Sequence, residues 1–235
     1  LSAFEINKKN LTDNQLDIPE SNNGIPDLLD EALWGVKAWE QLQEDDGGVR
    51  AGVESYRHPW GIYFANEDPL PYWTYARDAN VTARAAGIFA QASYLIKPYD
   101  RIKADSLQIK AEKAWQYAQS HQANGNFMLY ASGELFRLTK EQKYKDNFND
   151  NWHYFKQLAL GHLRLNEYIT GNRPMPDYVL AYLMATDEND PIKIEAMQYF
   201  KNYANNIIDR INNEHAHRNA RPGNYSLDWG NGTTT

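Results

Sequence analysis

The sequence contains no cysteine, few positive charges and no long hydrophobic run, and each of these absences excludes a class of protein. Without cysteine the chain can form no disulfide, thiolate metal site or cysteine nucleophile. Its 24 Lys and Arg residues are outnumbered by 31 Asp and Glu residues, a net charge of −7, whereas nucleic-acid binding needs clustered positive charge. The longest wholly apolar run, 178–185, is far shorter than the roughly 20 residues of a membrane-spanning helix. We expect neither nucleic acid nor a membrane as a partner, and no signal peptide is visible.

Several common catalytic motifs are also missing. The sequence has no glycine-rich phosphate loop, no HExxH pair, no GxSxG elbow and no EF-hand spacing. We therefore expect no cofactor and no metal.

Aromatic residues are the unusual abundance. The 7 Trp, 16 Tyr and 8 Phe residues make up 13% of the 235 residues. Such rings combine a flat apolar face with a polar edge, which suits a hydrophobic core and a sugar-binding cleft equally well. No linker of Ser, Gly or Pro divides the chain, so residues 1–235 are expected to form one unit without a second domain.

Helical spacing of apolar residues runs through most of the chain, and no segment shows sustained strand alternation, which predicts an all-α fold. Residues 1–24 are expected to be irregular, and 49–77 to be a long connection with short β-like pieces. Helices are expected over 26–43, 78–96, 100–121, 126–138, 140–158, 159–169, 176–186 and 191–213. Sequential antiparallel helix pairs with functional loops at one end are typical of an α/α solenoid or toroid.

Two pairs of aspartates could be read as acid and base, but structural roles are favoured for both. Asp45 and Asp46 directly precede two glycines, which indicates a turn. Asp27 and Asp30 fall where a helix is expected to start, and carboxylates there oppose the helix dipole.

The most specific pattern is the run from Asp17 to Glu31, followed by Asp46-Gly47-Gly48-Val49. This run resembles the interior of the catalytic domain of glycoside hydrolase family 9, the inverting cellulases. Further stretches agree in the same order, namely 79–94, Gly133-Glu134-Leu135-Phe136-Arg137-Leu138-Thr139 with Lys143-Tyr144, and Asp228-Trp229-Gly230-Asn231.

The resemblance implies part of an (α/α)6 toroid of twelve helices, whose loops at one end line a cleft for a β-1,4-linked glycan. The chain resembles the middle of such a domain, so the rest of the catalytic domain is an expected partner. In the family, the base comes from an Asp-Ala-Gly-Asp motif that precedes the matching region, and the acid is a glutamate near the end of the domain. Neither motif is present here, so we assign no catalytic residue to this chain and expect it to be inactive alone.

Substrate-binding residues can be carried over one at a time from the resemblance. His58 and Trp60 match a loop over the cleft, and Trp229 matches a late Trp-Gly turn beside it. The remaining positions are two pairs at the starts of expected helices: Phe127, Tyr130, Asp177 and Tyr178. A role in the core is the alternative for Trp60, Phe127 and Tyr130.

The resemblance implies an endoglucanase-like enzyme that acts on cellulose or cello-oligosaccharides, with glucosamine oligosaccharides as the alternative substrate. The acidic loop around Glu54, Glu67, Asp68 and Asp78 resembles an exo-acting branch that removes glucosamine from chitosan oligosaccharides, where carboxylates hold an ammonium group. A solvated acidic loop is the alternative explanation. A non-catalytic carbohydrate-binding module and a toroid isomerase or lyase are the other classes considered. The resemblance implies a secreted or periplasmic protein, or a cytoplasmic one for the glucosaminidase branch.

Overall fold

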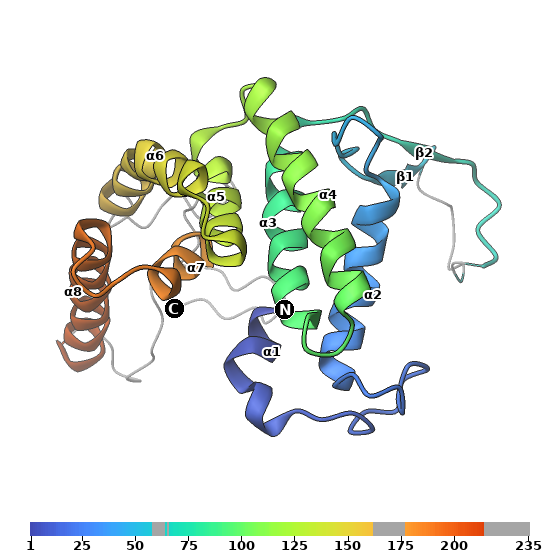
Figure 1. Ribbon diagram of the computed structural model, residues 1–235, viewed down its shortest axis with the longest axis horizontal. Helices are drawn as coiled ribbons and strands as arrows, with labels where there is room; N and C mark the ends of the chain where they lie inside the picture. The colour runs from blue at the N-terminus through green and yellow to red at the C-terminus, as the bar shows by residue number, and fades with distance from the viewer. Residues whose placement is uncertain (58–63, 65, 162–176, 214–235) are drawn as a thin grey trace.

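Polar connections divide the chain into helices that lie side by side (Figure 1). The structure is a computed structural model that describes residues 1–57, 64, 66–161 and 177–213. Its elements are α1 (Ser2–Asn7), the short 3-10 helix η1 (Lys8–Asn10), α2 (Asp27–Gln41), β1 (Val53–Ser55), β2 (Tyr72–Thr74), α3 (Ala79–Ile96), α4 (Arg101–Ser120), α5 (Gly125–Thr139), α6 (Gln142–Gly161), α7 (Asp177–Ala185) and α8 (Pro191–Asn213). The prediction of an all-α fold is confirmed.

Helix α3 is largely buried, because its small side chains let its neighbours approach closely. Ala83, Ala86 and Ala90 are completely buried, and α3 packs against α2, α4 and α5. The Ser93 hydroxyl donates a hydrogen bond of 2.8 Å to the carbonyl of Ala104 in α4. Alanine-rich packing thus brings α3 and α4 together along their length.

The inner row of the fold is formed by α3, α5 and α7, with α2, α4 and α6 packed against it. Helix α5 contacts α3 on one side and α7 on the other, and it also packs against α6. The α6–α7 contact is aromatic, since the rings of Phe148 and Tyr182 stack with centroids 3.8 Å apart. Trp115 of α4 meets Tyr144 of α6 edge to face at 4.9 Å. These four rings are buried, so part of the aromatic abundance belongs to the core.

Side chains of the predicted breaks cap the helices that follow them. The Asp78 carboxylate accepts a hydrogen bond of 2.9 Å from the Val81 amide at the start of α3. Asp100 accepts one from Lys103 at the start of α4, also at 2.9 Å. Such caps satisfy amides that have no partner within the helix, which explains why the helices begin where they do.

Two predictions about the helices are wrong. Residues 1–24 were expected to be irregular, but α1 forms there because Phe4 enters the core with only 2% of its surface exposed. A break was expected at residues 158 and 159, but α6 continues to Gly161. Residues 157–161 contain no helix breaker before that glycine. The remainder of the helix expected at 159–169 lies outside the described residues.

None of the described helices is both long and apolar enough to cross a membrane.

Candidate functional site

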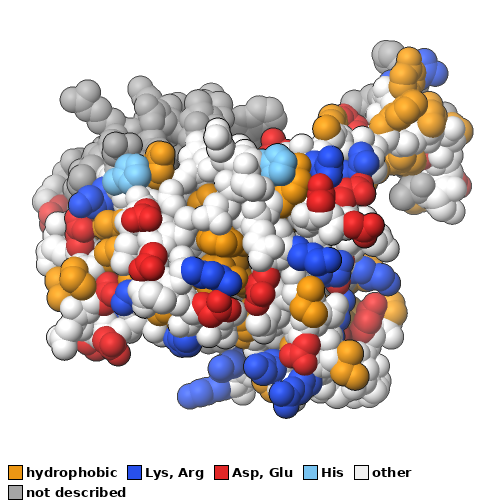
Figure 2. All heavy atoms as spheres, turned by 45° about the horizontal axis from the view of Figure 1, so that its top comes forward, with side chains coloured by type: hydrophobic (Ala, Val, Ile, Leu, Met, Phe, Trp, Pro, Cys, Tyr) orange, Lys and Arg blue, Asp and Glu red, His pale blue; other side chains and the backbone are white. Residues whose placement is uncertain are grey.

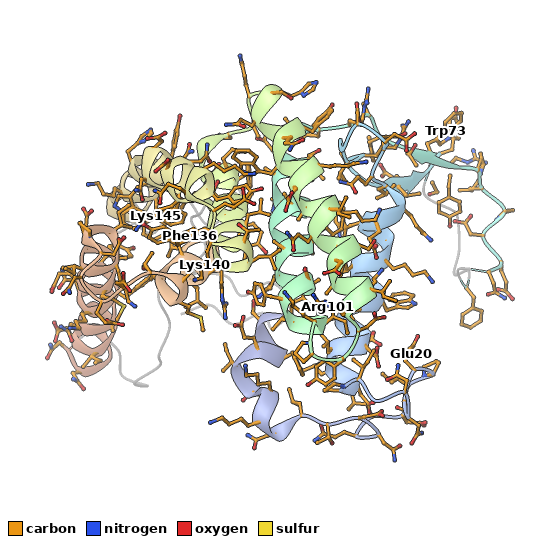
Figure 3. The ribbon with its side chains drawn as sticks, in the orientation of Figure 1. Glu20, Trp73, Arg101, Phe136, Lys140 and Lys145 are labelled. Carbon is orange, nitrogen blue, oxygen red and sulfur yellow. The ribbon has the colours of Figure 1, made fainter. Side chains whose placement is uncertain are left out.

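The antiparallel order of the helices brings several predicted site residues to one end of the fold. Helices α2 and α4 finish, and α3 and α5 begin, at the upper end in Figure 1. We call this the loop end, because the long connection 42–78 leaves and returns there. Glu20 and Arg101 mark the opposite end in Figure 3.

A tight turn at residues 45–48 fixes the start of the long connection to the helices. The carboxylate of Asp46 accepts a hydrogen bond of 3.1 Å from the Gly48 amide and forms an ion pair with Arg77. The Gly48 hydrogen bond and the Arg77 side chain together lower the pKa of Asp46. A Cβ atom on Gly48 would lie 2.6 Å from the Tyr117 ring of α4, so only glycine fits. The predicted turn role of Asp46 is confirmed.

Phe127 and Tyr130 lie near the start of α5 and face α3. The guanidinium of Arg84 lies over the Phe127 ring, 5.5 Å from its centroid. The Tyr130 ring packs directly on Gly87, where a Cβ atom would come within 2.6 Å of Cδ1. Both rings are half-buried, so each joins the two helices while keeping part of its surface open. Their role in glycan binding remains a prediction.

The structure describes the other candidate residues only in part. Asp177 and Tyr178 open α7, which packs against α5, but their side chains are not described. His58, Trp60 and Trp229 lie outside the described residues. Their predicted binding roles therefore remain predictions.

Asp78, Asp68 and Glu67, three of the four acidic residues predicted in the loop, contact protein groups. Asp78 caps α3, as described above. Asp68 accepts hydrogen bonds from the Tyr72 hydroxyl at 2.7 Å and from the Leu70 amide at 3.0 Å, and these two bonds lower its pKa. The Glu67 carboxylate lies 3.5 Å from the Phe64 amide. The solvated-loop explanation fits these contacts better than an ammonium site does.

Asp27 and Asp30 lie at the opposite end of the helices from the loop end and serve the fold. Asp27 accepts hydrogen bonds from the amides of Asn14, Gln15 and Leu16. Burial alone would raise the pKa of Asp27, but these backbone hydrogen bonds outweigh it and lower the pKa. Asp27 lies in the first turn of α2, as predicted, and in addition it anchors the preceding loop.

Asp30, one turn further along α2, has the opposite electrostatic behaviour. Burial raises its pKa, and its Oδ2 atom has no hydrogen-bond partner among the described residues. The neighbouring charges of Glu20, Asp13 and Asp27 raise the pKa further. Among the described residues, no group of three potential metal ligands is close enough to hold an ion.

Sequence reasoning missed a set of exposed rings on the hairpin formed by β1 and β2. Tyr56, Trp73 and Tyr75 are 50–69% exposed, and Trp73 stands on the arm that projects from the helices in Figure 3. The signal was available, because Trp73 and Tyr75 are two residues apart and so share a face of any strand. A hollow of about 330 Å³ lies beside these rings, lined also by Glu54, Ser55 and Thr74.

A polar cluster that ties α1 to the inner row was also not predicted from the sequence. Arg137 of α5 pairs with Glu5 of α1 and donates a hydrogen bond of 2.9 Å to the Tyr94 hydroxyl. Tyr94 in turn donates to Glu134 at 2.9 Å. Burial, with the nearby Glu134 charge, raises the pKa of Tyr94 far above its ordinary value, so this hydroxyl stays protonated. No local pattern predicts a contact between residues so far apart in the chain.

The family model "Glycosyl hydrolase family 9" matches residues 9–235. The cellulose 1,4-β-cellobiosidase of Acetivibrio thermocellus is 29% identical over 175 residues, which are 63% of this chain and 20% of that protein. Endoglucanase C of Cellulomonas fimi is 31% identical over 128 residues, which are 53% of this chain and 11% of that protein.

Solved structures agree with the fold. The family 9 endoglucanase J30 superposes with a TM-score of 0.77 at 19% identity, covering 94% of this chain and 44% of that structure. The helices therefore form part of an (α/α)6 barrel, as predicted. The chain spans less than half of each of these proteins. Because the relatives found are cellulose-degrading and related glucanases, the glucosaminidase alternative is not favoured.

Proposed function

Because this chain belongs to glycosyl hydrolase family 9, we propose that it is part of an inverting glycosidase that cleaves β-1,4-linked glycans, with cellulose or cello-oligosaccharides as substrate. The observation that carries the proposal is the family match across residues 9–235. The geometry supports it, since the loop end gathers the long connection 42–78 and the start of α5 on one side of the fold.

We further propose that the contribution of this chain is to bind and orient the glycan. An inverting glycosidase needs an acid and a base whose carboxyl groups are about 6.5–9.5 Å apart, with water and the sugar between them. At the loop end, Asp46, Asp68 and Asp78 are each engaged in holding a turn, a strand or a helix start. The sequence also lacks an Asp-Ala-Gly-Asp motif. The catalytic pair is therefore assigned to the rest of the catalytic domain.

The proposed unit is an incomplete toroid spanning residues 1–235. Its support is the coverage of the solved structures, of which the chain matches 44% in the case of J30. Exposed apolar side chains on the outer helix α4, namely Ile102 at 84% and Ile109 at 59% exposure, are consistent with a surface covered by further helices.

The test is hydrolysis of cellopentaose followed by NMR of the anomeric protons. The complete catalytic domain should release the α-anomer first, because inversion changes the configuration of the β-linkage. Residues 1–235 alone should release no sugar. Hydrolysis by this chain alone would mean that it contains a catalytic pair, and binding without cleavage by the complete domain would favour the non-catalytic carbohydrate-binding alternative.

The predicted cleft residues give a second, independent measurement. Trp60→Ala and Trp229→Ala should weaken glycan binding about two- to tenfold, since stacking of a ring contributes on the order of 1 kcal/mol. The melting temperature should barely change. A loss of stability of roughly 3 kcal/mol with binding intact would instead place the ring in the core.

A further inference from the structure

The hairpin of β1 and β2 places three rings and one carboxylate on the same face. The strands pair antiparallel, with Glu54 opposite Trp73 and Ser55 opposite Tyr72. Side chains alternate between the two faces of a strand, so Tyr56 and Tyr75 share the face of Glu54 and Trp73. We call the rings of Tyr56, Trp73 and Tyr75 the aromatic face.

The aromatic face is open to solvent. Tyr56 is 69% exposed, Trp73 61% and Tyr75 50%. Figure 2 shows the arm standing clear of the helices, with hydrophobic side chains over its surface. Within the part of the chain that the structure describes, the hydroxyls of Tyr56 and Tyr75 and the indole nitrogen of Trp73 have no hydrogen-bond partner. The rings therefore offer both stacking surfaces and free polar edges.

The base of the hairpin is firmly attached to the loop end. Arg50 forms an ion pair of 2.6 Å with Glu44 and donates hydrogen bonds of 3.2 Å to the Thr74 hydroxyl and to the Tyr75 carbonyl. The Ala51 amide donates to the Ala76 carbonyl at 3.1 Å. These bonds hold the aromatic face in place beside the loop end, which lowers the entropic cost of binding a ligand there.

The chemistry of this face fits a neutral, polyhydroxylated chain. Flat rings stack on the apolar face of a pyranose, and the Glu54 carboxylate lies on the same face beside the hollow that these rings line. Glu54 is the one charged residue among those that line the hollow, so an anionic ligand would be repelled by its carboxylate. An uncharged glycan meets no such repulsion.

We propose that the aromatic face is an auxiliary subsite that stacks on the glycan chain as it extends beyond the main cleft. This inference rests on the proposed function, because it takes the same glycan as its ligand. It predicts that long chains bind better than short ones, since only a chain that reaches past the loop end can contact the hairpin.

The test compares cellohexaose with cellobiose, using calorimetric titration of the full chain and its variants. Trp73→Val removes the ring but retains high strand propensity, so the hairpin should persist. Cellohexaose affinity should fall about two- to tenfold, while cellobiose affinity stays unchanged. Trp73→Tyr, which keeps a stacking ring, should restore most of the loss.

Trp34→Ala is the matched control. Trp34 is similarly exposed, at 67%, but it lies on α2 and not on the hairpin, so its removal should leave cellohexaose affinity unchanged. The proposal is overturned if Trp73→Val binds cellohexaose as wild type does, or if Trp34→Ala loses as much affinity. It is also overturned if Trp73→Val dissociates a dimer in sedimentation while glycan affinity persists, because the rings would then form a protein interface.

Failure of this inference and failure of the proposed function give different results. Cellohexaose that binds through Trp73 but is never cleaved by the complete domain would refute the glycosidase proposal and leave the subsite standing. Normal cleavage of cellohexaose with no effect of Trp73→Val would refute the subsite alone.

Discussion

Replacing Gly87 by alanine tests the closest approach between two inner helices. Gly87 of α3 lies under the Tyr130 ring of α5, and an added Cβ atom would come 2.6 Å from Cδ1 and 2.8 Å from Cζ of that ring. Carbon atoms at their optimal separation are about 3.5–4.0 Å apart. The methyl group therefore cannot enter unless the ring or one of the helices moves.

Two opposing effects set the size of the change. Alanine is favoured over glycine within a helix by about 1 kcal/mol, whereas overpacking a filled interface costs about 1–3 kcal/mol. Gly87→Ala should therefore lower the free energy of unfolding by up to about 2 kcal/mol. Gly35→Ala in α2 is the matched control, because nothing lies within 4 Å of its added Cβ atom. That variant should gain about 1 kcal/mol.

Urea denaturation followed by circular dichroism measures both variants. The test is sharpened by repeating Gly87→Ala in a Tyr130→Ala background, where the ring that causes the clash is absent. There the same substitution should become stabilising, as it is at Gly35. If Gly87→Ala stabilises the otherwise unchanged protein as much as Gly35→Ala does, the close contact between α3 and α5 is refuted.

Three further predictions concern caps, charge and burial. Asp78→Ala removes the cap of α3 and should cost about 1 kcal/mol in urea denaturation; a cost near zero would contradict the capping role. Burial raises the pKa of the Asp30 carboxyl above its ordinary value of 3.8, so the folded protein binds the carboxyl proton more tightly than the unfolded chain does. The folded protein therefore loses stability as the pH rises from 3.8 towards the raised pKa. Asp30→Asn should therefore gain stability over wild type with rising pH, up to the raised pKa, and a pH-independent difference would refute this. Arg137→Met leaves the largely buried Glu5 carboxylate without its cation and should cost about 3 kcal/mol; Glu5→Gln in the same protein should recover part of that loss.

Local signals predicted much of the fold because they act over a few residues. The start of α2 could be read from Pro26 and its end from the Asp-Asp-Gly-Gly turn at 45–48. The cap at Asp78 and the alanines of α3 marked one of the central helices. The family resemblance supplied the toroid, which no local pattern contains.

Contacts between distant residues could not be predicted in this way. Helix α1 is held by the burial of Phe4 and by the pairing of Glu5 with Arg137, which is 132 residues away in the sequence. Asp27 is a helix-start carboxylate, as predicted, but the loop that it also binds follows a path that depends on the whole fold. The aromatic face was not predicted, because the family resemblance pointed to His58 and Trp60 between the strands and not to the alternation of rings within them.

The order of contacts along the inner row also bears on how the chain folds. The principal packing of α2 to α7 joins helices that are neighbours or next neighbours in the sequence, and such low contact order is associated with fast folding. These helices could therefore assemble one after another as the chain emerges during synthesis. Helix α1 is the exception, since its partner Arg137 is made long after it. We expect α1 to dock last, and Arg137→Met should accelerate unfolding far more than it slows folding.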